Sequence, residues 1–498
     1  MRRAALLVLA ACSTPASAVT VVKPPVVVPI SEPAEYAIDR ISRDAGEAIF
    51  ARTGIGDPYR TGVPYPIFLA LLRGFPNTFG PDLATRFGFV ARAADPNSDD
   101  ADARAGLPIG MHLTTDPITG VPFVVTSCAL CHAERLRWPG GEALVIGLAN
   151  KRVRIHAYDA AFAEITTERG FTAQRLGRLA AEAAAERKIA WPELYAGALV
   201  AGTIDALQKR AAERAELRKR TENNPPGRVA TIDAFVGVLG QLAHADVAYA
   251  PAVGWAKVPD VIGFAQRTTL SWDASGEGPM DLLAVEADVA AGVRVEWLER
   301  HPFQGASLGA YLRQPAPRPR FPGKIDRGLA ERGRALFAKH CETCHGTYAP
   351  DGRALDYEEK IIALEDVGTD PARALAATES FERAANAPAL TRGYTRFHRT
   401  NGYVPPVLTN VWARAPYGHA GQWPSLAVLA TPPDRRPTRF TLDYDAPYDL
   451  VSVGVTVRDA PGAYLQDASQ AGFAVTGHPF LAELRGDAPA VIEYLKTL

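Results

Sequence analysis

Four of the five cysteines in this sequence belong to two copies of one pattern, two cysteines separated by two residues and followed directly by a histidine. The copies are Cys128-Ala129-Leu130-Cys131-His132 and Cys341-Glu342-Thr343-Cys344-His345. On a helical turn, residues three and four positions apart share one face, so each copy brings two thiols and one imidazole together. Two thiols can form thioether bonds to the edge of a porphyrin while the imidazole binds its iron. Each copy therefore predicts one covalently bound haem c.

Other uses of a CxxC pair are a structural zinc site, a redox-active dithiol and a disulfide. A zinc site would require the two pairs, which lie far apart in the sequence, to meet in space. A redox dithiol does not need a histidine directly after it. We therefore expect two haem c groups, attached through Cys128 and Cys131 and through Cys341 and Cys344, with His132 and His345 as iron ligands.

The fifth cysteine, Cys12, indicates where the protein is located. It follows a basic start and a short apolar run, and Leu9-Ala10-Ala11-Cys12 resembles the lipobox of bacterial lipoproteins. Residues 1–18 are predicted to be a signal peptide, with cleavage after Ala18 as the alternative to lipidation at Cys12. We expect an exported, periplasmic or extracytoplasmic protein that contacts the membrane only through a lipid anchor. No other apolar stretch approaches the roughly 20 residues that span a bilayer.

Proline-rich stretches divide the chain of 498 residues. Residues 19–35 are predicted to be an extended tether and residues 313–323 a linker, because proline fixes φ and removes backbone donors. The body then comprises an N-terminal haem domain at 36–312 and a C-terminal domain at 324–498. The formal net charge is −1, which gives no reason to expect nucleic acid as a partner. The expected partners are a redox protein or small electron donor, and peroxide or oxygen.

The C-terminal segment shows helical spacing at both ends. Asp326 is expected to cap a helix that leads through Gly333 and Phe337 to Cys341. Asp487 is expected to cap a helix with an apolar face that continues to Leu498. These two helices resemble the crossed terminal helices of the cytochrome c fold, in which a small residue permits close approach and an aromatic ring fills the crossing.

The N-terminal segment is less regular. The spacing predicts a helix over about 191–217, which the turn residues at 223–227 end. Alternation typical of long strands is scarce. We therefore expect a mainly α protein with two cytochrome c-like haem domains, the N-terminal one enlarged, and a few short strands.

The sixth iron ligands would separate an electron carrier from an enzyme. The sequence has three methionines, none of them after Cys344, so a His/Met pair at the second haem is not expected from that segment. His478, which lies just before the last helix, is the preferred ligand. His419 stays open as a second candidate, and His398 is expected in a polar network. For the first haem, the residues leave Met111, His112 and His156 undecided.

The chain resembles the bacterial di-haem cytochrome c peroxidase and MauG superfamily, and within it the branch of the secreted rubber oxygenases. The resemblance is clearest over 324–498 and rests on the two CxxCH sites and on the stretches Val367 to Pro371, Leu408 to Tyr417 with His419, and Gly477-His478. It also extends to 107–110 and to Gly227-Arg228 with Asp233.

The resemblance implies a division of roles between the haems. The haem on His132 would be the reactive centre and the haem on His345 would relay electrons. His478 stands where the peroxidases have methionine, and a bis-histidine haem has a lower potential than a His/Met haem. Asp370 before Pro371 is expected to cap a helix, with a calcium ion between the domains as the alternative. Trp272 is expected to be a buried structural residue, or to line the distal side of the first haem or lie between the haems.

Together these features predict an exported di-haem c-type cytochrome that transfers electrons between two covalent haems and activates peroxide or oxygen at the N-terminal one. The alternative is a pure electron-transfer cytochrome with both irons six-coordinate. The sequence leaves open whether the protein is an enzyme, peroxidase-like or oxygenase-like, and it names no catalytic side chain, organic substrate or oligomeric state.

Overall fold

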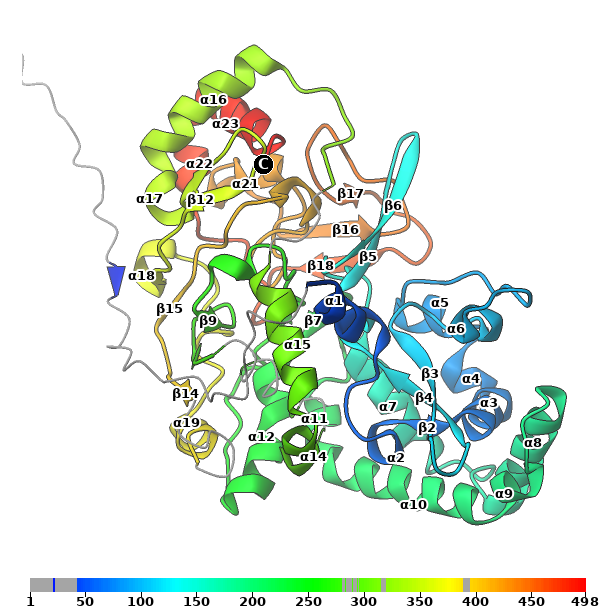
Figure 1. Cartoon of the computed structure of the whole chain (residues 1–498). Helices are drawn as coiled ribbons and strands as arrows, with labels where there is room; N and C mark the ends of the chain where they lie inside the picture. The colour runs from blue at the N-terminus through cyan, green and yellow to red at the C-terminus, as the bar shows by residue number, and fades with distance from the viewer. Residues whose placement is uncertain are drawn as a thin grey trace, which may run out of the picture.

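The computed structural model describes residues 21–22, 43–279, 295–314, 319–387 and 395–498, together with Leu283, Val289 and Val293. It is mainly helical, with 42% helix and 14% strand, which confirms the predicted fold class (Figure 1). The expected signal peptide with Cys12, most of the tether and residues 315–318 of the expected linker lie outside the described residues. Within these residues, no helix has the length and apolar character that crossing a membrane requires.

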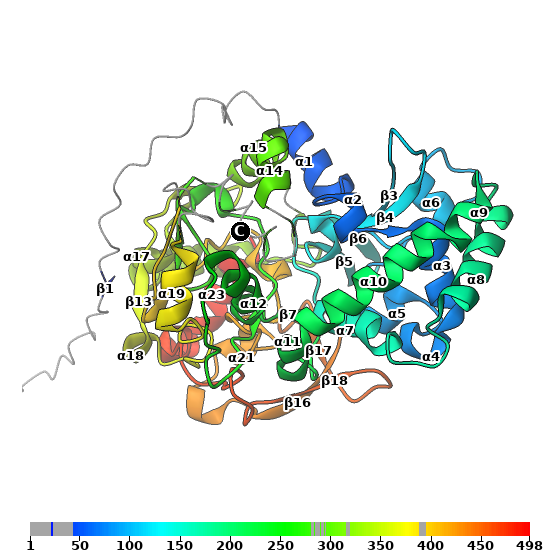
Figure 2. The ribbon, with the colours of Figure 1, turned by 90° about the horizontal axis from the view of Figure 1, so that it is seen from below.

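The longer helices of the N-terminal half surround its core and form its outer wall. Figures 1 and 2 place α8, α9 and α10 at the end of the molecule opposite α17 and α18. The helices before residue 320 are α1 (Arg43–Arg52), α2 (Pro58–Thr61), α3 (Tyr65–Gly74), α4 (Pro76–Phe79), α5 (Leu83–Phe87), α6 (Ala101–Ala105), α7 (Ile155–Ile165), α8 (Ala173–Glu186), α9 (Pro192–Ala196), α10 (Ala198–Glu213), α11 (Ala215–Arg220), α12 (Thr231–Ala243), α14 (Val295–Arg300) and α15 (Pro302–Arg313).

The C-terminal half begins with its longest helix and ends with the helix that crosses it. Its helices are α16 (Arg327–His340), α17 (Glu342–His345), α18 (Leu364–Val367), α19 (Glu379–Ala385), α21 (Leu426–Leu429), α22 (Phe480–Glu483) and α23 (Ala488–Leu495).

The strands are short and pair antiparallel in small sheets. They are β1 (Val21–Val22), β2 (Val63–Pro64), β3 (Met111–Thr115), β4 (Pro122–Thr126), β5 (Ala133–Trp138), β6 (Gly141–Ile146), β7 (Arg228–Val229), β8 (Ala256–Lys257), β9 (Thr269–Leu270), β10 (Gly276–Glu277), β11 (Thr347–Tyr348), β12 (Ala354–Asp356), β13 (Ile361–Ala363), β14 (Arg396–Phe397), β15 (Gly402–Tyr403), β16 (Arg439–Asp443), β17 (Thr456–Val457) and β18 (Tyr464–Asp467).

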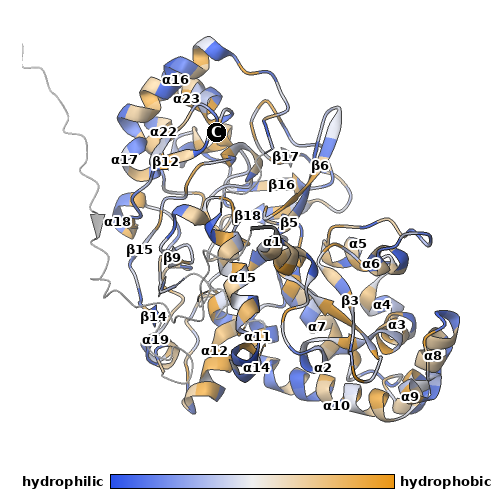
Figure 3. Ribbon diagram, in the orientation of Figure 1, coloured by the Kyte–Doolittle hydropathy of each residue, from blue (hydrophilic) through white to orange (hydrophobic). Residues whose placement is uncertain are grey.

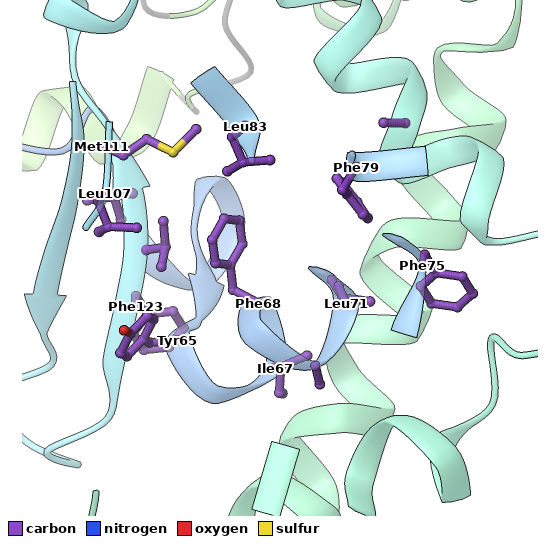
Figure 4. Packing of buried hydrophobic residues seen from close by; sticks show 14 of the residues in the cluster. Tyr65, Ile67, Phe68, Leu71, Phe75, Phe79, Leu83, Leu107, Met111 and Phe123 are labelled. Atoms are coloured by element: carbon purple, nitrogen blue, oxygen red, sulfur yellow. The ribbon is translucent and has the colours of Figure 1, made fainter. Parts of the chain in front are cut away.

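The N-terminal core forms around α3, whose apolar sequence packs against α8 and the β3–β4 hairpin. Ile67, Phe68 and Leu71 are fully buried there (Figure 4). α8 begins at Thr172, whose hydroxyl accepts a hydrogen bond from the backbone N–H of Arg175, and it turns an alanine-rich face inward. Burial of such apolar side chains stabilises the fold by roughly 1.5–3 kcal/mol for each large one.

The C-terminal core forms around the crossing of α16 and α23. Hydrophilic and hydrophobic residues alternate along α16 (Figure 3), and its buried positions include Gly333 and Phe337. A Cβ atom on Gly333 would lie 1.8 Å from the carbonyl oxygen of Ala490, so only glycine permits this approach. The ring of Phe337 lies 5.2 Å from that of Tyr494. The crossed helices and the Asp326 cap, whose carboxylate accepts from Leu329 N at 2.9 Å, are as predicted.

The two halves interlock. The β5–β6 hairpin directly follows His132, yet Leu136 and Val145 pack in the C-terminal core. In the other direction, the fully buried guanidinium of Arg228 donates hydrogen bonds to the carbonyl oxygens of Ala420 and Gly421, at 2.9 and 2.8 Å. Neither half therefore completes its packing without the other.

Three local predictions are corrected. The helix expected over 191–217 is divided into α9, α10 and α11. Asp487 gives no side-chain cap to α23, which ends at Leu495, because its carboxylate pairs with Arg332 instead. Asp370 begins a turn rather than a helix. Its carboxylate accepts from the backbone N–H groups of Ala372, Gly472 and Ala474, so it fastens the loop before His478.

Candidate haem sites

The second CxxCH lies where α16 ends and α17 begins. The backbone N–H groups of Cys344 and His345 both donate to the carbonyl of Cys341, at 3.1 and 3.0 Å, which holds the three side chains on one tight turn. Because α16 is fixed by its crossing with α23, this turn has a rigid base. The local sequence therefore places two sulfur atoms and one imidazole on the same surface, as the motif requires.

His345 is oriented by a carbonyl and faces a second histidine. Its Nδ1 donates to the carbonyl oxygen of Pro406 at 2.9 Å, which leaves Nε2 as the nitrogen that can bind a metal. The ring of His478 lies 6.2 Å from the His345 ring, centroid to centroid. Two metal–imidazole bonds of roughly 2 Å each, together with the radii of two imidazole rings, fill such a span. These residues therefore fit an iron held between His345 and His478.

The loop that carries His478 is held in place by several groups. His478 has φ +44° and the preceding Gly477 has φ +80°, where a Cβ would lie 2.4 Å from Thr369 N. The buried Arg436 donates to the carbonyl oxygens of Gly477 and His478, at 2.6 and 3.2 Å. Desolvation lowers the pKa of His478 to about 3, so the imidazole is neutral and its lone pair is available. Its buried Nδ1 has no hydrogen-bond partner in the described structure.

The first CxxCH forms one turn of 3-10 helix at Cys128–Leu130. The backbone N–H groups of Cys131 and His132 donate to the carbonyl of Cys128, at 3.2 and 3.0 Å. Nδ1 of His132 donates to the carbonyl oxygen of Pro259 at 2.8 Å. The two candidate iron ligands are thus oriented in the same way, each by the carbonyl of a distant proline.

The first site opens on a cavity of about 740 Å³, which Cys128, Cys131 and His132 line together, so this space would accommodate the haem itself. Within the described part of the chain, the ring that packs against His132 is that of Phe50, at 5.9 Å, and phenylalanine cannot bind iron. Trp272 also lines the cavity and donates from Nε1 to the carbonyl of Lys257 at 3.1 Å. The cavity wall from α7 and α10 consists of Ile155, His156, Tyr158, Asp159, Phe162, Ala198, Leu199, Gly202, Thr203, Ala206, Leu207 and Arg210.

The three distal candidates for this site have different environments. Met111 is fully buried in the N-terminal core. His112 has both ring nitrogens bonded, Nδ1 to Asp102 at 2.7 Å and Nε2 to Ser127 at 3.1 Å. His156 lies on the cavity wall, and its Nε2 accepts from the backbone N–H of Ala230 at 2.9 Å. Burial lowers its pKa to about 4. Of the three, His156 alone borders the cavity.

The remaining histidine candidates for the second site are in polar networks. His419 stacks on Tyr403 at 4.1 Å and contacts Gln422, and burial lowers its pKa to about 3. Its described ring contact is therefore with a tyrosine and not with His345. His398 lies 3.1 Å from a carboxylate oxygen of Glu277. The assignment of His478 rather than His419 as iron ligand stays a prediction, and the 6.2 Å geometry favours it.

The alternative uses of the cysteines find no support among the described residues. All four motif cysteines are free of disulfides. No group of three or more His, Cys, Asp or Glu side chains that could hold a metal ion occurs there, so these residues give no support to a zinc site, and the calcium ion stays a prediction. Desolvation raises the pKa of Cys131 and of Cys341 to about 12, the opposite of an activated redox thiol.

Comparison with known proteins gives a partial match. Residues 402–441 match the family described as RoxA-like, cytochrome c-like. The chain is 24% identical to the uncharacterized protein y4iJ of Sinorhizobium fredii, over 88% of this chain and 89% of that protein. It is also 25% identical to the uncharacterized protein y4iM of the same organism, over 44% of this chain and 56% of that protein. The family match supports a cytochrome c-like relationship, with haem c as the cofactor.

The matched segment contains groups that serve the second site. It includes Pro406, which orients His345, and Arg436, which holds the His478 loop. Sequence reasoning did not find these residues, nor Pro259. Nothing local marks a carbonyl acceptor, since Pro259 and Pro406 lie far along the chain from the histidines they orient.

Proposed function

We propose that this chain is an exported di-haem c-type cytochrome in which the C-terminal haem relays electrons and the N-terminal haem activates peroxide or oxygen. The observation that carries the proposal is the difference between the two sites. His345 faces His478 across 6.2 Å, whereas the ring that packs against His132 among the described residues is that of Phe50, which cannot bind iron. When bound, the haem groups supply one-electron transfer, and an iron with an open sixth position can also bind a small oxidant.

The residues of the C-terminal site act by holding the two imidazoles in place. Pro406 fixes the ring orientation of His345, and Arg436 with Gly477 fixes the loop of His478. Two strong ligands on opposite sides leave no position for a substrate, which suits a relay. The resemblance to di-haem peroxidases and rubber oxygenases implies the same division of roles, and the match at 402–441 supports the coarser statement that the chain is a haem cytochrome.

His156 of the N-terminal site presents a ring N–H whose position is fixed by a hydrogen bond on the other ring nitrogen. His156 lies on the cavity wall, and because its Nε2 accepts from Ala230 N, the neutral ring carries its proton on Nδ1. We propose His156 as the first side chain to test as a hydrogen-bond donor, through its Nδ1–H, to a molecule bound at this site. Its lowered pKa, about 4, keeps the ring neutral at pH 7.

The location and partners belong to the same proposal. The lipobox-like sequence ending at Cys12 supports export and a lipid anchor, and a soluble or membrane redox protein would then exchange electrons with the C-terminal haem. Replacement of Cys12 by alanine should release the protein from the membrane fraction. Retention of the variant in that fraction would contradict the anchor.

The function is tested by low-temperature EPR of the matured ferric protein, repeated after half-reduction and after addition of cyanide or peroxide. We expect one low-spin signal that ignores both ligands, from the C-terminal haem, and one signal that shifts with ligand. Two low-spin signals that do not respond in either state would instead establish an electron carrier with both irons closed.

A further inference from the structure

A buried ion pair lies between the backbone segments that orient the two candidate iron ligands. Nε of Arg414 is 3.2 Å from Oδ1 of Asp260, and the two side chains are 6% and 8% exposed. A charged pair at such depth is retained only where its groups are well bonded. Its surroundings show what it connects.

On one side, the pair joins the N-terminal site. Asp260 directly follows Pro259, whose carbonyl accepts the Nδ1 hydrogen of His132 at 2.8 Å. Arg414 also reaches this segment directly, since its Nη2 donates to the carbonyl oxygen of Ile262 at 2.8 Å. The carboxylate and the guanidinium therefore both hold the backbone segment from Pro259 to Ile262, which orients His132.

On the other side, the same guanidinium joins the C-terminal site. Nη1 of Arg414 donates to the carbonyl oxygen of Val407. Val407 directly follows Pro406, whose carbonyl accepts the Nδ1 hydrogen of His345 at 2.9 Å. A continuous path of hydrogen bonds, peptide links and this one ion pair thus runs from His132 through Pro259, Asp260, Arg414, Val407 and Pro406 to His345.

The pair is also close to the cavity, because Asp260, Arg414, Pro406 and Val407 all line it together with His132. Lys257, another buried cation of the wall, donates from Nζ to the carbonyl of Arg414 at 2.7 Å, which holds the arginine backbone as well. In such a water-poor region, a single charge acts over a longer distance than it does at the surface.

We infer that Asp260 and Arg414 are positioning residues that couple the two haem sites. They hold both proximal imidazoles through one ion pair, and their charges act on both irons. A nearby cation favours the reduced iron and so raises its midpoint potential, and a nearby carboxylate favours the oxidised iron and so lowers it. Each of the two charges therefore shifts the midpoint potentials of the two haems in the same direction. The inference rests on the proposed di-haem function.

The test is a redox titration of the matured full-length protein, followed by optical and EPR spectroscopy so that the two haems are resolved. Asp260→Asn leaves the arginine charge unbalanced and should raise both midpoint potentials. Arg414→Met leaves the carboxylate unbalanced and should lower both. Arg414→Lys keeps the positive charge but loses the planar guanidinium with its several N–H donors. Its midpoint potentials should therefore lie closer to those of the wild type than those of Arg414→Met do, while the EPR signals of both haems still broaden.

Arg436→Met is the matched control, because this buried arginine holds the His478 loop and should alter the C-terminal haem alone. A shift confined to one haem in the Asp260 or Arg414 variants would overturn the inference, and so would shifts in the same direction in Asp260→Asn and in Arg414→Met. If Arg414→Met does not fold, Asp260→Asn alone still decides it, since an amide of the same shape remains.

The mass of the denatured wild-type protein distinguishes a failure of the proposed di-haem function from a failure of the proposed coupling between the haems. A mass increase of one haem rather than two would refute the proposed di-haem function itself. If two haems are bound covalently but Asp260→Asn shifts the midpoint potential of one haem alone, only the coupling would be refuted.

Discussion

The two CxxCH sites of this protein are alike on one side and different on the other. In both, a histidine donates from Nδ1 to a proline carbonyl, at 2.8 Å for His132 and 2.9 Å for His345. Opposite His345 lies the imidazole of His478, whereas the described ring beside His132 is the phenyl ring of Phe50. The motif and its carbonyl partner therefore define how a haem is held, and the facing side decides what it can do.

The difference arises from the elements that face each motif. The C-terminal site is closed by a short loop with left-handed residues, which Arg436 holds against the α16–α23 crossing. The N-terminal site is bordered by α7 and α10, which contribute apolar residues and His156 to the wall of the cavity that Cys128 and Cys131 also line.

The largest expected effect comes from removing one haem at a time. Cys341→Ser with Cys344→Ser should abolish covalent attachment at the closed site and keep the cyanide-responsive signal. Cys128→Ser with Cys131→Ser should remove that signal and leave the closed, unresponsive haem. Mass spectrometry and EPR of both double variants measure the outcome. If the cyanide response survives in the second variant, the two sites have been assigned in the wrong order.

The next effect concerns His478. His478→Gly should convert the C-terminal haem from a low-spin to a high-spin or cyanide-binding form, because the closing imidazole is gone. Added imidazole should restore the low-spin spectrum. The control is His419→Gln, which alters a histidine stacked on Tyr403 and should leave the haem spectrum unchanged. An unaltered spectrum in His478→Gly would exclude it as the ligand.

A smaller effect is expected at the helix crossing beneath the closed site. Gly333→Ala should lower the free energy of unfolding by roughly 2 kcal/mol, because the new Cβ would meet the carbonyl of Ala490 at 1.8 Å. Gly237→Ala in α12 is the matched control, since nothing lies within 4 Å of its Cβ position, and it should stabilise by roughly 0.5–1 kcal/mol. Denaturant unfolding of both variants decides whether the close crossing is real. Equal stabilisation would mean that it is not.

The last expected effect is a change in the pH dependence of stability. Burial lowers the pKa of His419 from 6.5 to about 3, so between these values the unfolded chain binds one proton more than the folded chain. The free energy of unfolding should therefore fall by about 1.4 kcal/mol per pH unit on acidification below 6.5. His419→Gln should remove this contribution to the slope. His156→Gln, at the N-terminal site, should remove a slope of the same sign that ends near pH 4.

How much the sequence could predict depends on whether a signal is local. The α16 helix with its Asp326 cap, and Gly333 with Phe337 at the crossing, follow from spacing within one helix. The cap expected at Asp487 is wrong because a partner from another helix, Arg332, takes its carboxylate. Pro259, Pro406 and the ion pair of Asp260 with Arg414 depend on chain segments that meet only in the folded state. No periodicity marks them in advance.

The β5–β6 hairpin has a consequence for assembly. It leaves the N-terminal site immediately after His132, and Leu136 and Val145 join the buried cluster that contains Trp412 and Val491. The segment that follows the first pair of cysteines therefore completes its packing when the C-terminal half folds against it.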